Sequence, residues 1–189
     1  MINLRSDKQI IIGHYPISND YIVWNYVDKS EDASTAYFLS NESIAVKPFM
    51  KLANGQDANK LKNCYYISSD LQKWLNGEFL EEYFNPEERK RIKSVSIPTI
   101  NNIVNWFPLE EYRVCMPSLM AKENGASVYY SYNDLETCVY WLADTGRKAG
   151  MSATVVLADG KIYKSAYLAA TNVCVRPVLE IIGGETQWD

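Results

Sequence analysis

Segments rich in β-branched and aromatic residues stand at both ends of this sequence, and helix signals stand between them. Residues 9–12, 21–27 and 35–40 have the composition of β-strands, and so do the segments after residue 138. The helix signals begin at Ser69 and end near residue 122. This order favours an α+β domain whose terminal strands pair across antiparallel sheets, with two or three short helices in the first two thirds. It does not fit a parallel α/β sheet.

Two hairpins are predicted. Residues 21–27 and 35–40 flank the polar turn 28–32, and residues 153–157 and 161–163 flank Ala158-Asp159-Gly160. The second is the clearer one, because Asp-Gly tolerates the positive φ angles of a tight turn. Residues 173–181 form the closing strand, and Pro177 predicts that this strand lies at an edge or carries a bulge.

The middle of the chain contains helix boundaries. Ser68 or Ser69 suits an N-cap, and Asn85-Pro86 opens a second helix that we expect to reach about Lys93. A third short helix follows at 117–122. Strands are expected at 95–97, 113–116 and 138–142, whereas residues 99–111 have no clear pattern and Tyr129, Tyr130 and Tyr132 are assigned to a loop.

Length and charge narrow the class of protein. The 189 residues fit one domain spanning 1–189, and the 47% hydrophobic share is that of a globular protein. A net charge of −4 and a pI near 5.1 argue against nucleic-acid binding, which needs clustered Lys and Arg. No apolar run approaches the length of a signal peptide or a membrane span. We expect a cytoplasmic protein, or part of a phage-like particle assembled there.

The cysteines and the single histidine do not suggest a metal site. Cys64, Cys115, Cys138 and Cys174 lie far apart in sequence, and His14 is the only histidine. A zinc site usually includes at least one closely spaced ligand pair. We expect free, buried or half-buried thiols, no metal and no cofactor. His14 has no recognisable catalytic partners.

Several segments, in order, resemble DUF6273, a family of bacterial and phage domains of unknown function that resembles the C-type-lectin-like fold. The segments are Gly13-His14-Tyr15-Pro16, Ile22-Val23-Trp24, Leu39-Ser40, Lys47-Pro48-Phe49, 69–76 with Phe79, Phe84 and Glu87-Glu88, then 113–118, Tyr140-Trp141-Leu142 and 175–179. The resemblance covers about residues 10–181. It implies a lectin-like α+β domain.

Two positions depart from the family pattern. An Arg is missing where this chain has Ala143, and Cys174 stands where a Gly is usual. Any ligand contact made by that Arg in relatives is therefore absent. Reading the residues alone, we expect Trp24, Trp74, Trp141 and Arg176 to have structural roles, with Arg176 anchoring loop carbonyls or a carboxylate.

A recognition surface is predicted in two loops. Residues 124–134 and 144–152 are rich in Gly, Ser, Asn and Tyr, the composition of adaptable binding loops. In lectin-like domains the loops before the final strands commonly form the ligand face, so the resemblance points to the same region. The candidate contacts are Tyr129, Tyr130, Tyr132, Asp144, Arg147, Lys148 and Tyr167.

The sequence therefore predicts a non-enzymatic binding module for an unknown protein or carbohydrate ligand, phage-derived or associated with a phage particle. An interaction or inhibitor protein acting on host or phage machinery is one alternative, and a target of a diversity-generating retroelement is another. A third is an enzyme related to formylglycine-generating enzymes, which share the lectin-like fold and need paired thiols, here Cys138 and Cys174.

Overall fold

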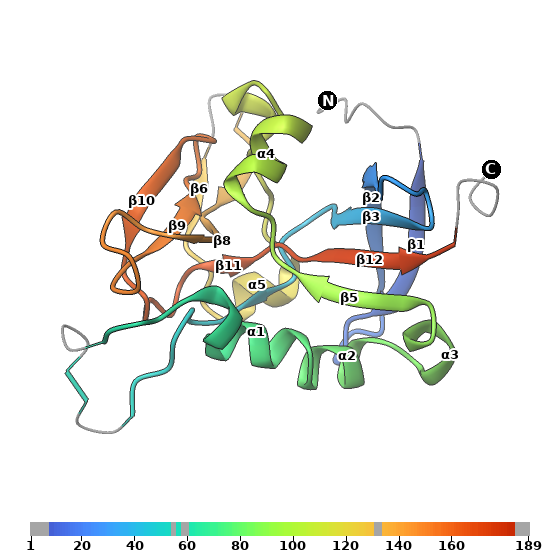
Figure 1. Ribbon diagram of the computed structural model, residues 1–189, viewed down its shortest axis with the longest axis horizontal. Coiled ribbons are helices and arrows are strands. Elements are labelled where there is room, and N and C mark those ends of the chain that lie inside the picture. Colours follow the sequence, from blue (N-terminus) through green and yellow to red (C-terminus); the bar gives the residue numbers. More distant parts are fainter. Residues whose placement is uncertain (1–7, 54–55, 58–60, 131–133, 184–189) are drawn as a thin grey trace.

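Two five-stranded sheets form the framework of the protein (Figure 1). The computed structural model describes residues 8–53, 56–57, 61–130 and 134–183, and the structural statements below concern these residues. The first sheet has the order β1-β2-β3-β12-β5, the second β10-β9-β8-β11-β4, and β6 and β7 form a separate pair. The strands are β1 (Gln9–His14), β2 (Tyr21–Lys29), β3 (Thr35–Ser40), β4 (Ala45–Val46), β5 (Ile92–Ser96), β6 (Val128–Tyr130), β7 (Glu136–Cys138), β8 (Tyr140–Thr145), β9 (Ala153–Val156), β10 (Ile162–Ala166), β11 (Cys174–Val175) and β12 (Val178–Ile182).

The N-terminal hairpin is confirmed. Strands β2 and β3 pair antiparallel, and β1 adds to the other side of β2. The register of β1 shifts between Ile11 and His14, where Gly13 has a φ of +75°. A Cβ on Gly13 would lie 2.7 Å from the Phe84 ring, so both the backbone conformation and the space require glycine here.

The second predicted hairpin is also confirmed. Strands β9 and β10 pair antiparallel, and the Leu157 N–H donates to the Lys161 carbonyl at 2.8 Å. Gly160 has a φ of +86°, and a Cβ there would lie 1.9 Å from the Glu110 carbonyl oxygen. The turn is thus packed against the start of the 3₁₀ turn η3 (Glu110–Tyr112).

The closing segment corrects one prediction. Residues 173–181 divide at Pro177 into β11, in the second sheet, and β12, in the first. Strand β12 is not an edge strand, because it pairs with both β3 and β5. Pro177 lacks an N–H, but it lies between the two strands, and its carbonyl accepts from the Ser40 N–H at 3.0 Å. The pairing of β12 with the N-terminal strand β3 is the predicted pairing of terminal strands.

The helices are short and lie within the first two thirds of the chain, as expected, but five α-helices are described instead of two or three. They are α1 (Asp70–Leu75), α2 (Glu78–Tyr83), α3 (Pro86–Arg89), α4 (Ile100–Trp106) and α5 (Leu119–Glu123), with 3₁₀ turns η2 (Tyr66–Ser68) and η3 (Glu110–Tyr112). The predicted caps Ser69 and Asn85 each accept hydrogen bonds from the first turn of their helix. Helix α4 falls in the segment without a clear pattern, where Thr99 forms a capping box with Asn102.

Four other local expectations are corrected. The helix opened by Asn85 ends at Arg89, because β5 begins at Ile92 and pairs with β12. No strand forms at 113–116, where Arg113 caps η3 and turns the chain. Tyr129 and Tyr130 belong to strand β6, and Tyr132 lies outside the described residues. The expected strand 138–142 divides between β7 and β8.

Three tryptophans predicted to be structural are buried in one large apolar cluster between the sheets and helices α1 and α2. The Trp24 indole N–H donates to the Ile12 carbonyl at 2.9 Å, and that of Trp141 donates to the Lys47 carbonyl at 2.8 Å. The Trp74 ring contacts Phe79 at a centroid distance of 5.2 Å, so α1 and α2 pack through aromatic rings.

Arg176 is buried, with 3% of its surface exposed, beside a second apolar cluster that includes Phe107 and Tyr140. Its guanidinium lies between the Phe107 and Tyr140 rings, and its Nε donates to the Ser40 carbonyl at 3.2 Å. Arg176 thus connects β11 to the end of β3, through a carbonyl and aromatic faces instead of a carboxylate.

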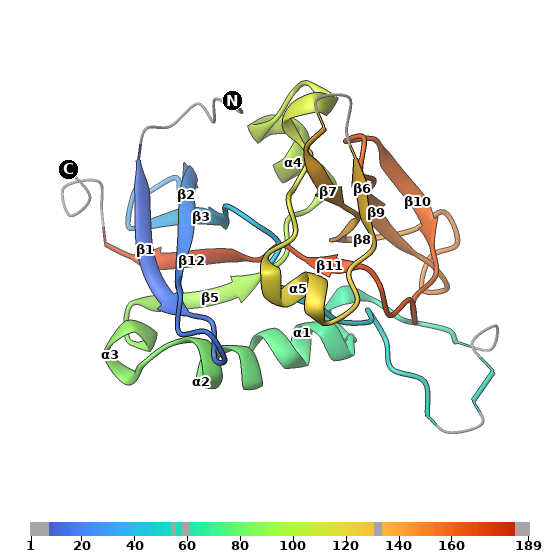
Figure 2. The same cartoon turned by 180° about the vertical axis from the view of Figure 1, so that it is seen from behind.

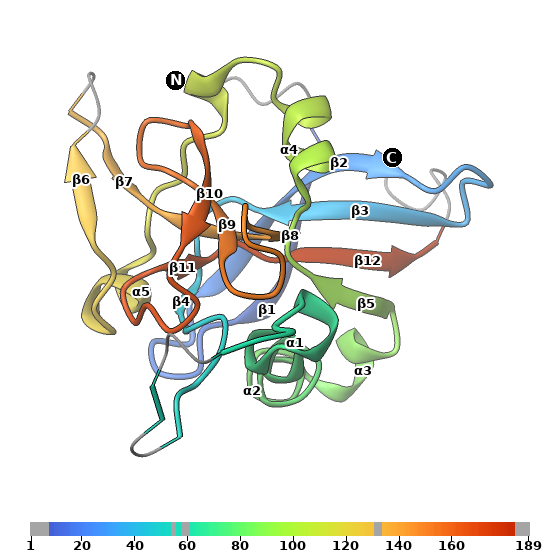
Figure 3. The same cartoon turned by 60° about the vertical axis from the view of Figure 1, so that its left-hand side comes forward.

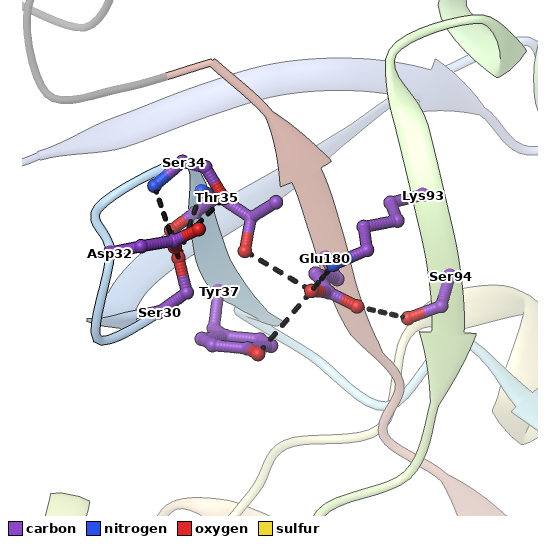
Figure 4. A network of polar contacts seen from close by, with 8 residues as sticks. All are labelled: Ser30, Asp32, Ser34, Thr35, Tyr37, Lys93, Ser94 and Glu180. Atoms are coloured by element: carbon purple, nitrogen blue, oxygen red, sulfur yellow. Dashed lines mark hydrogen bonds and ion pairs between the residues drawn. The ribbon is translucent and has the colours of Figure 1, made fainter.

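A polar network spans β3, β12 and the edge strand β5 of the first sheet at Glu180 of β12 (Figure 4). Its carboxylate accepts hydrogen bonds from Thr35 (3.1 Å), Tyr37 (3.3 Å), Ser94 (2.7 Å) and the Lys93 ammonium (2.9 Å). Burial raises the pKa of Glu180, but the bonds from Lys93, Ser94 and Thr35 outweigh it and lower the pKa below its usual value. The network joins β3, β12 and β5.

None of the helices in the described parts of the chain has the length and apolar character needed to cross a membrane.

Candidate functional site

A pocket of about 330 Å³ opens between the turn that joins β1 to β2, the residue Glu42 and helix α5. Figures 2 and 3 show the β1–β2 turn beside α5, although the two are about a hundred residues apart in the sequence. The volume is at the lower end of the range for ligand pockets, roughly 300–1,000 Å³. The pocket is lined by Tyr15, Ile17, Ser18, Asp20, Tyr21, Glu42, Ser118, Leu119, Met120 and Glu123.

The β1–β2 turn is closed by its own hydrogen bonds. The Tyr15 N–H donates to the Asp20 carbonyl and the Asn19 N–H to the Tyr15 carbonyl, both at 2.9 Å. Asn19 adopts a φ of +59°, a conformation that Asn accepts more readily than most residues. The Asp20 N–H also donates to the Ser18 Oγ at 3.3 Å. These bonds fix one wall of the pocket without using the Asp20 carboxylate.

The opposite wall is fixed by α5 and the segment before β4. Ser43 and Pro117 form a parallel bridge, with the Ser43 N–H bonded to the Met116 carbonyl and the Ser118 N–H to the Ser43 carbonyl. The Ser118 Oγ accepts from the Ala121 N–H at 3.1 Å and caps α5. Glu42, next to Ser43, is therefore positioned by this backbone connection.

Aromatic side chains support the interior of the pocket. Tyr15 meets Tyr83 edge to face, with the ring centroids 6.4 Å apart. The Tyr83 hydroxyl donates to the Met120 sulfur at 3.5 Å. Burial raises the pKa of Tyr15 far above its usual value, so its phenol stays neutral at physiological pH.

The lining carries negative charge only. It includes the carboxylates of Asp20, Glu42 and Glu123, and it includes no Lys, Arg or His. Burial raises the pKa of Glu42, although the positive charge of Lys122 acts in the opposite direction. The Lys122 ammonium forms an ion pair with Glu136 and does not bond to Glu42.

The rim of the pocket is apolar and exposed. Ile17 is 81% exposed, Tyr21 is 74% exposed and Leu119 is 67% exposed. These values are among the highest for large hydrophobic side chains in the described residues. Single exposed apolar residues are ordinary, but three around one cavity form a surface suited to binding.

The predicted recognition residues lie elsewhere, and none of the six within the described parts of the chain lines this pocket. Tyr129 and Tyr130 are exposed on β6, and Tyr167 is exposed after β10. Arg147 and Lys148 are exposed in the turn between β8 and β9, whose Gly150 carbonyl accepts from Cys64. Figure 3 shows β6 and β7 as a pair apart from that turn.

Asp144 differs from the other predicted contacts. Its Oδ2 accepts a hydrogen bond from the Ile100 N–H at 2.6 Å, so in this structure the carboxylate lies at the first residue of α4. Negative charge is stabilising at a helix N-terminus. This contact gives Asp144 a local structural role. Its predicted ligand contact, like those of the other loop residues, stays a prediction.

The thiols are free and buried, as expected. The Cys138 thiol donates to the Cys115 carbonyl at 3.4 Å, and its sulfur lies 2.9 Å from the Ser43 Oγ. The Cys115 side chain lowers the pKa of Cys138, but Cys174 and burial outweigh this effect and raise the pKa to about 12. A thiol held in the protonated form is a weak nucleophile and a weak metal ligand. In the described residues, no group of three or more His, Cys, Asp and Glu side chains could hold a metal ion.

Sequence reasoning missed the pocket because its walls come from three distant segments. Two of its lining residues, Tyr15 and Ser118, lie in segments that the resemblance singled out, Gly13–Pro16 and 113–118. Nothing in those segments indicated a cavity. The exposed Ile17 between two turn residues was the available local signal.

Comparison with known proteins supports part of the resemblance. Neither a curated protein nor a solved structure matches the chain. The family model of DUF6273, a domain of unknown function, matches residues 34–112, from the start of β3 to the end of η3. Over this segment, which lies between the two parts of the chain that form most of the pocket, the protein is similar to the DUF6273 domains.

Proposed function

We propose that the protein is a non-enzymatic binding module whose ligand enters the pocket between the β1–β2 turn, Glu42 and α5. The observation that carries this proposal is the pocket itself, a concave site with an aromatic interior, an apolar rim and carboxylates in its lining. Its walls are held by backbone hydrogen bonds, so the site needs little reorganisation to accept a ligand.

The chemistry of the lining supports binding over catalysis. The lining includes neither His14 nor a cysteine, and the Ser118 hydroxyl is already bonded to the backbone of α5. The thiol pair that formylglycine chemistry would need is in the apolar interior, and the raised pKa of Cys138 keeps it protonated.

The C-type-lectin-like relationship and the phage origin belong to the same proposal. Both follow from the resemblance to DUF6273, which the family match supports over residues 34–112, and the pairing of β12 with the N-terminal strand β3 supports the first. A search of the neighbouring DNA tests the origin, because phage structural genes, or a reverse transcriptase beside a near-copy of part of this gene, would identify the source.

The pocket is tested by NMR titration of the folded protein with small amines, carboxylic acids and monosaccharides. We expect the binding compounds to shift the amide signals of residues 15–21, 42 and 118–123. Ser18→Trp, which places an indole at the mouth of the pocket, should abolish these shifts, whereas Tyr130→Ala should leave them unchanged. Shifts centred on Tyr129, Tyr130 and Tyr167 would instead favour the loop surface, and no binding by any class would contradict the proposal.

A further inference from the structure

The three carboxylates in the pocket have no ion-pair or hydrogen-bond partner among the residues that the structure describes. Among the described residues, the carboxylates of Asp20, Glu42 and Glu123 take part in no ion pair and no side chain donates a hydrogen bond to them. Carboxylates that serve the fold are usually satisfied, as Glu180 is by four donors. Unpaired carboxylates that line one cavity favour a positively charged occupant.

Glu42 has the strongest requirement for such a partner. It is half-buried, and burial is the largest effect on its carboxylate. A carboxylate that has lost part of its hydration without gaining a hydrogen bond is destabilised. A cation placed beside it would stabilise the ionised form. The nearby Lys122 does not do this, because its ammonium bonds to Glu136 on β7.

The rim indicates what carries the cation. Ile17, Tyr21 and Leu119 expose most of their side-chain surface around the opening. A free amine small enough for the pocket would leave these residues in water. A protein segment would cover them with its own apolar side chains, in the usual arrangement in which a buried anchor is surrounded by flanking contacts that exclude water.

We propose that the pocket binds an arginine or lysine side chain of a partner protein, with the cation at Glu42 and apolar residues on either side of it against Ile17, Tyr21 and Leu119. The inference rests on the proposed function, since it names the ligand class of the same pocket. The stem of either side chain suits the Tyr15 and Met120 walls, and its charged end suits the carboxylates.

Four capped tripeptides test the ligand class. They have the sequence acetyl-Leu-Xaa-Leu-amide, with arginine, lysine, norleucine or glutamate at the centre, and binding is followed by amide shifts of residues 15–21, 42 and 118–123. We expect the arginine or lysine peptide to bind at least roughly tenfold more tightly than the norleucine peptide, and the glutamate peptide not to bind. Added salt should weaken the cationic peptides and leave the norleucine peptide unchanged.

Substitutions in the protein provide the matched controls. Glu42→Gln keeps the shape of the side chain and removes its charge, so it should weaken the cationic peptides at least roughly tenfold. Asp20→Asn should weaken them less, and Glu111→Gln, which removes an exposed carboxylate on η3 away from the pocket, should have no effect. Equal binding of the arginine and norleucine peptides, unaffected by Glu42→Gln, would overturn the cation inference and leave the pocket proposal standing.

Two further outcomes separate the parts of the inference. Argininamide that binds as tightly as the arginine peptide would overturn the assignment to a protein partner, because the rim would then contribute nothing. If none of the four peptides shifts the pocket signals at millimolar concentration, the inference fails, and the screen of amines, acids and sugars decides separately whether the pocket binds another class.

Discussion

Glu180 and Glu42 are both partly buried glutamates, and their surroundings are opposite. Glu180 lies on β12 of the first sheet, between β3 and β5, where three hydroxyl groups and the Lys93 ammonium donate to it and its pKa is lowered (Figure 4). Glu42 lies in the wall of the pocket, where no donor in the described residues reaches its carboxylate and its pKa is raised by burial. The same functional group is thus stabilised in one region and left without a partner in the other.

The difference separates a carboxylate that serves the fold from one that is open to a ligand. Glu180 holds three strands together, and every donor around it belongs to this chain. Glu42 contributes nothing comparable, and the backbone bridge at Ser43 keeps its position whether or not the side chain is charged. Proteins commonly give up some stability at binding sites, and the raised pKa of Glu42 is a local sign of that cost.

The largest effect is expected from Glu180→Gln. The amide cannot accept from all four donors, and its own N–H₂ group meets hydroxyls that were oriented toward a carboxylate. We expect a loss of about 1–3 kcal/mol in the free energy of unfolding at neutral pH, measured by urea denaturation. Glu111→Gln, an exposed substitution of the same type, is the control, and a loss equal to that of the control would show that the network does not stabilise the sheet.

An effect of opposite sign is expected from Glu42→Gln. Removing a desolvated charge that lacks a hydrogen bond should leave the free energy of unfolding unchanged or raise it by up to about 1 kcal/mol. The same denaturation experiment measures this. A loss as large as that of Glu180→Gln would mean that the Glu42 carboxylate is held by the fold, and the contrast between the two regions would disappear.

Several strands and helix starts could be anticipated from the sequence, whereas the surroundings of neither carboxylate could. Alternation and turn residues identify β2, β3, β9 and β10, and Ser69 and Asn85 identify the starts of two helices, because these signals are local. The register of β12 is not local. Whether Glu180 meets Lys93, Ser94 and Thr35 depends on pairing between strands that are separated by more than eighty residues.

The errors have the same physical origin. On local grounds Pro177 predicts an edge strand or a bulge, but a change of sheet at that residue accommodates its missing N–H equally well. Residues 86–93 have helical composition, yet pairing with β12 takes the chain into β5 from Ile92. The pocket depends on the approach of Tyr15, Glu42 and Ser118, which only the assembled sheets bring together.

The smallest expected effect is on how the free energy of unfolding depends on pH, because the pKa values of the two carboxylates are shifted in opposite directions. The pKa of Glu180 in the folded protein lies below the ordinary value of 4.5. The stabilisation that its carboxylate gives the folded state is therefore complete above pH 4.5 and is lost as the pH falls through the folded pKa. The pKa of Glu42 lies above 4.5, so the folded state is favoured relative to the unfolded state when this group is protonated, and that advantage is lost as the pH rises through the folded pKa.

Urea denaturation of the wild type and both variants across acidic pH measures the pH range in which each carboxylate changes the stability. As the pH falls, the difference between wild type and Glu42→Gln should diminish first, beginning above pH 4.5, because the folded-state pKa of Glu42 lies above that value. The difference between wild type and Glu180→Gln should persist and diminish only below pH 4.5. The reverse order would mean that the pocket carboxylate is the satisfied one. An arginine-bearing peptide that binds at Glu42 should shift the pH range of the Glu42 effect to lower pH, because a bound cation favours the ionised carboxylate. The pH range of the Glu180 effect should stay in place.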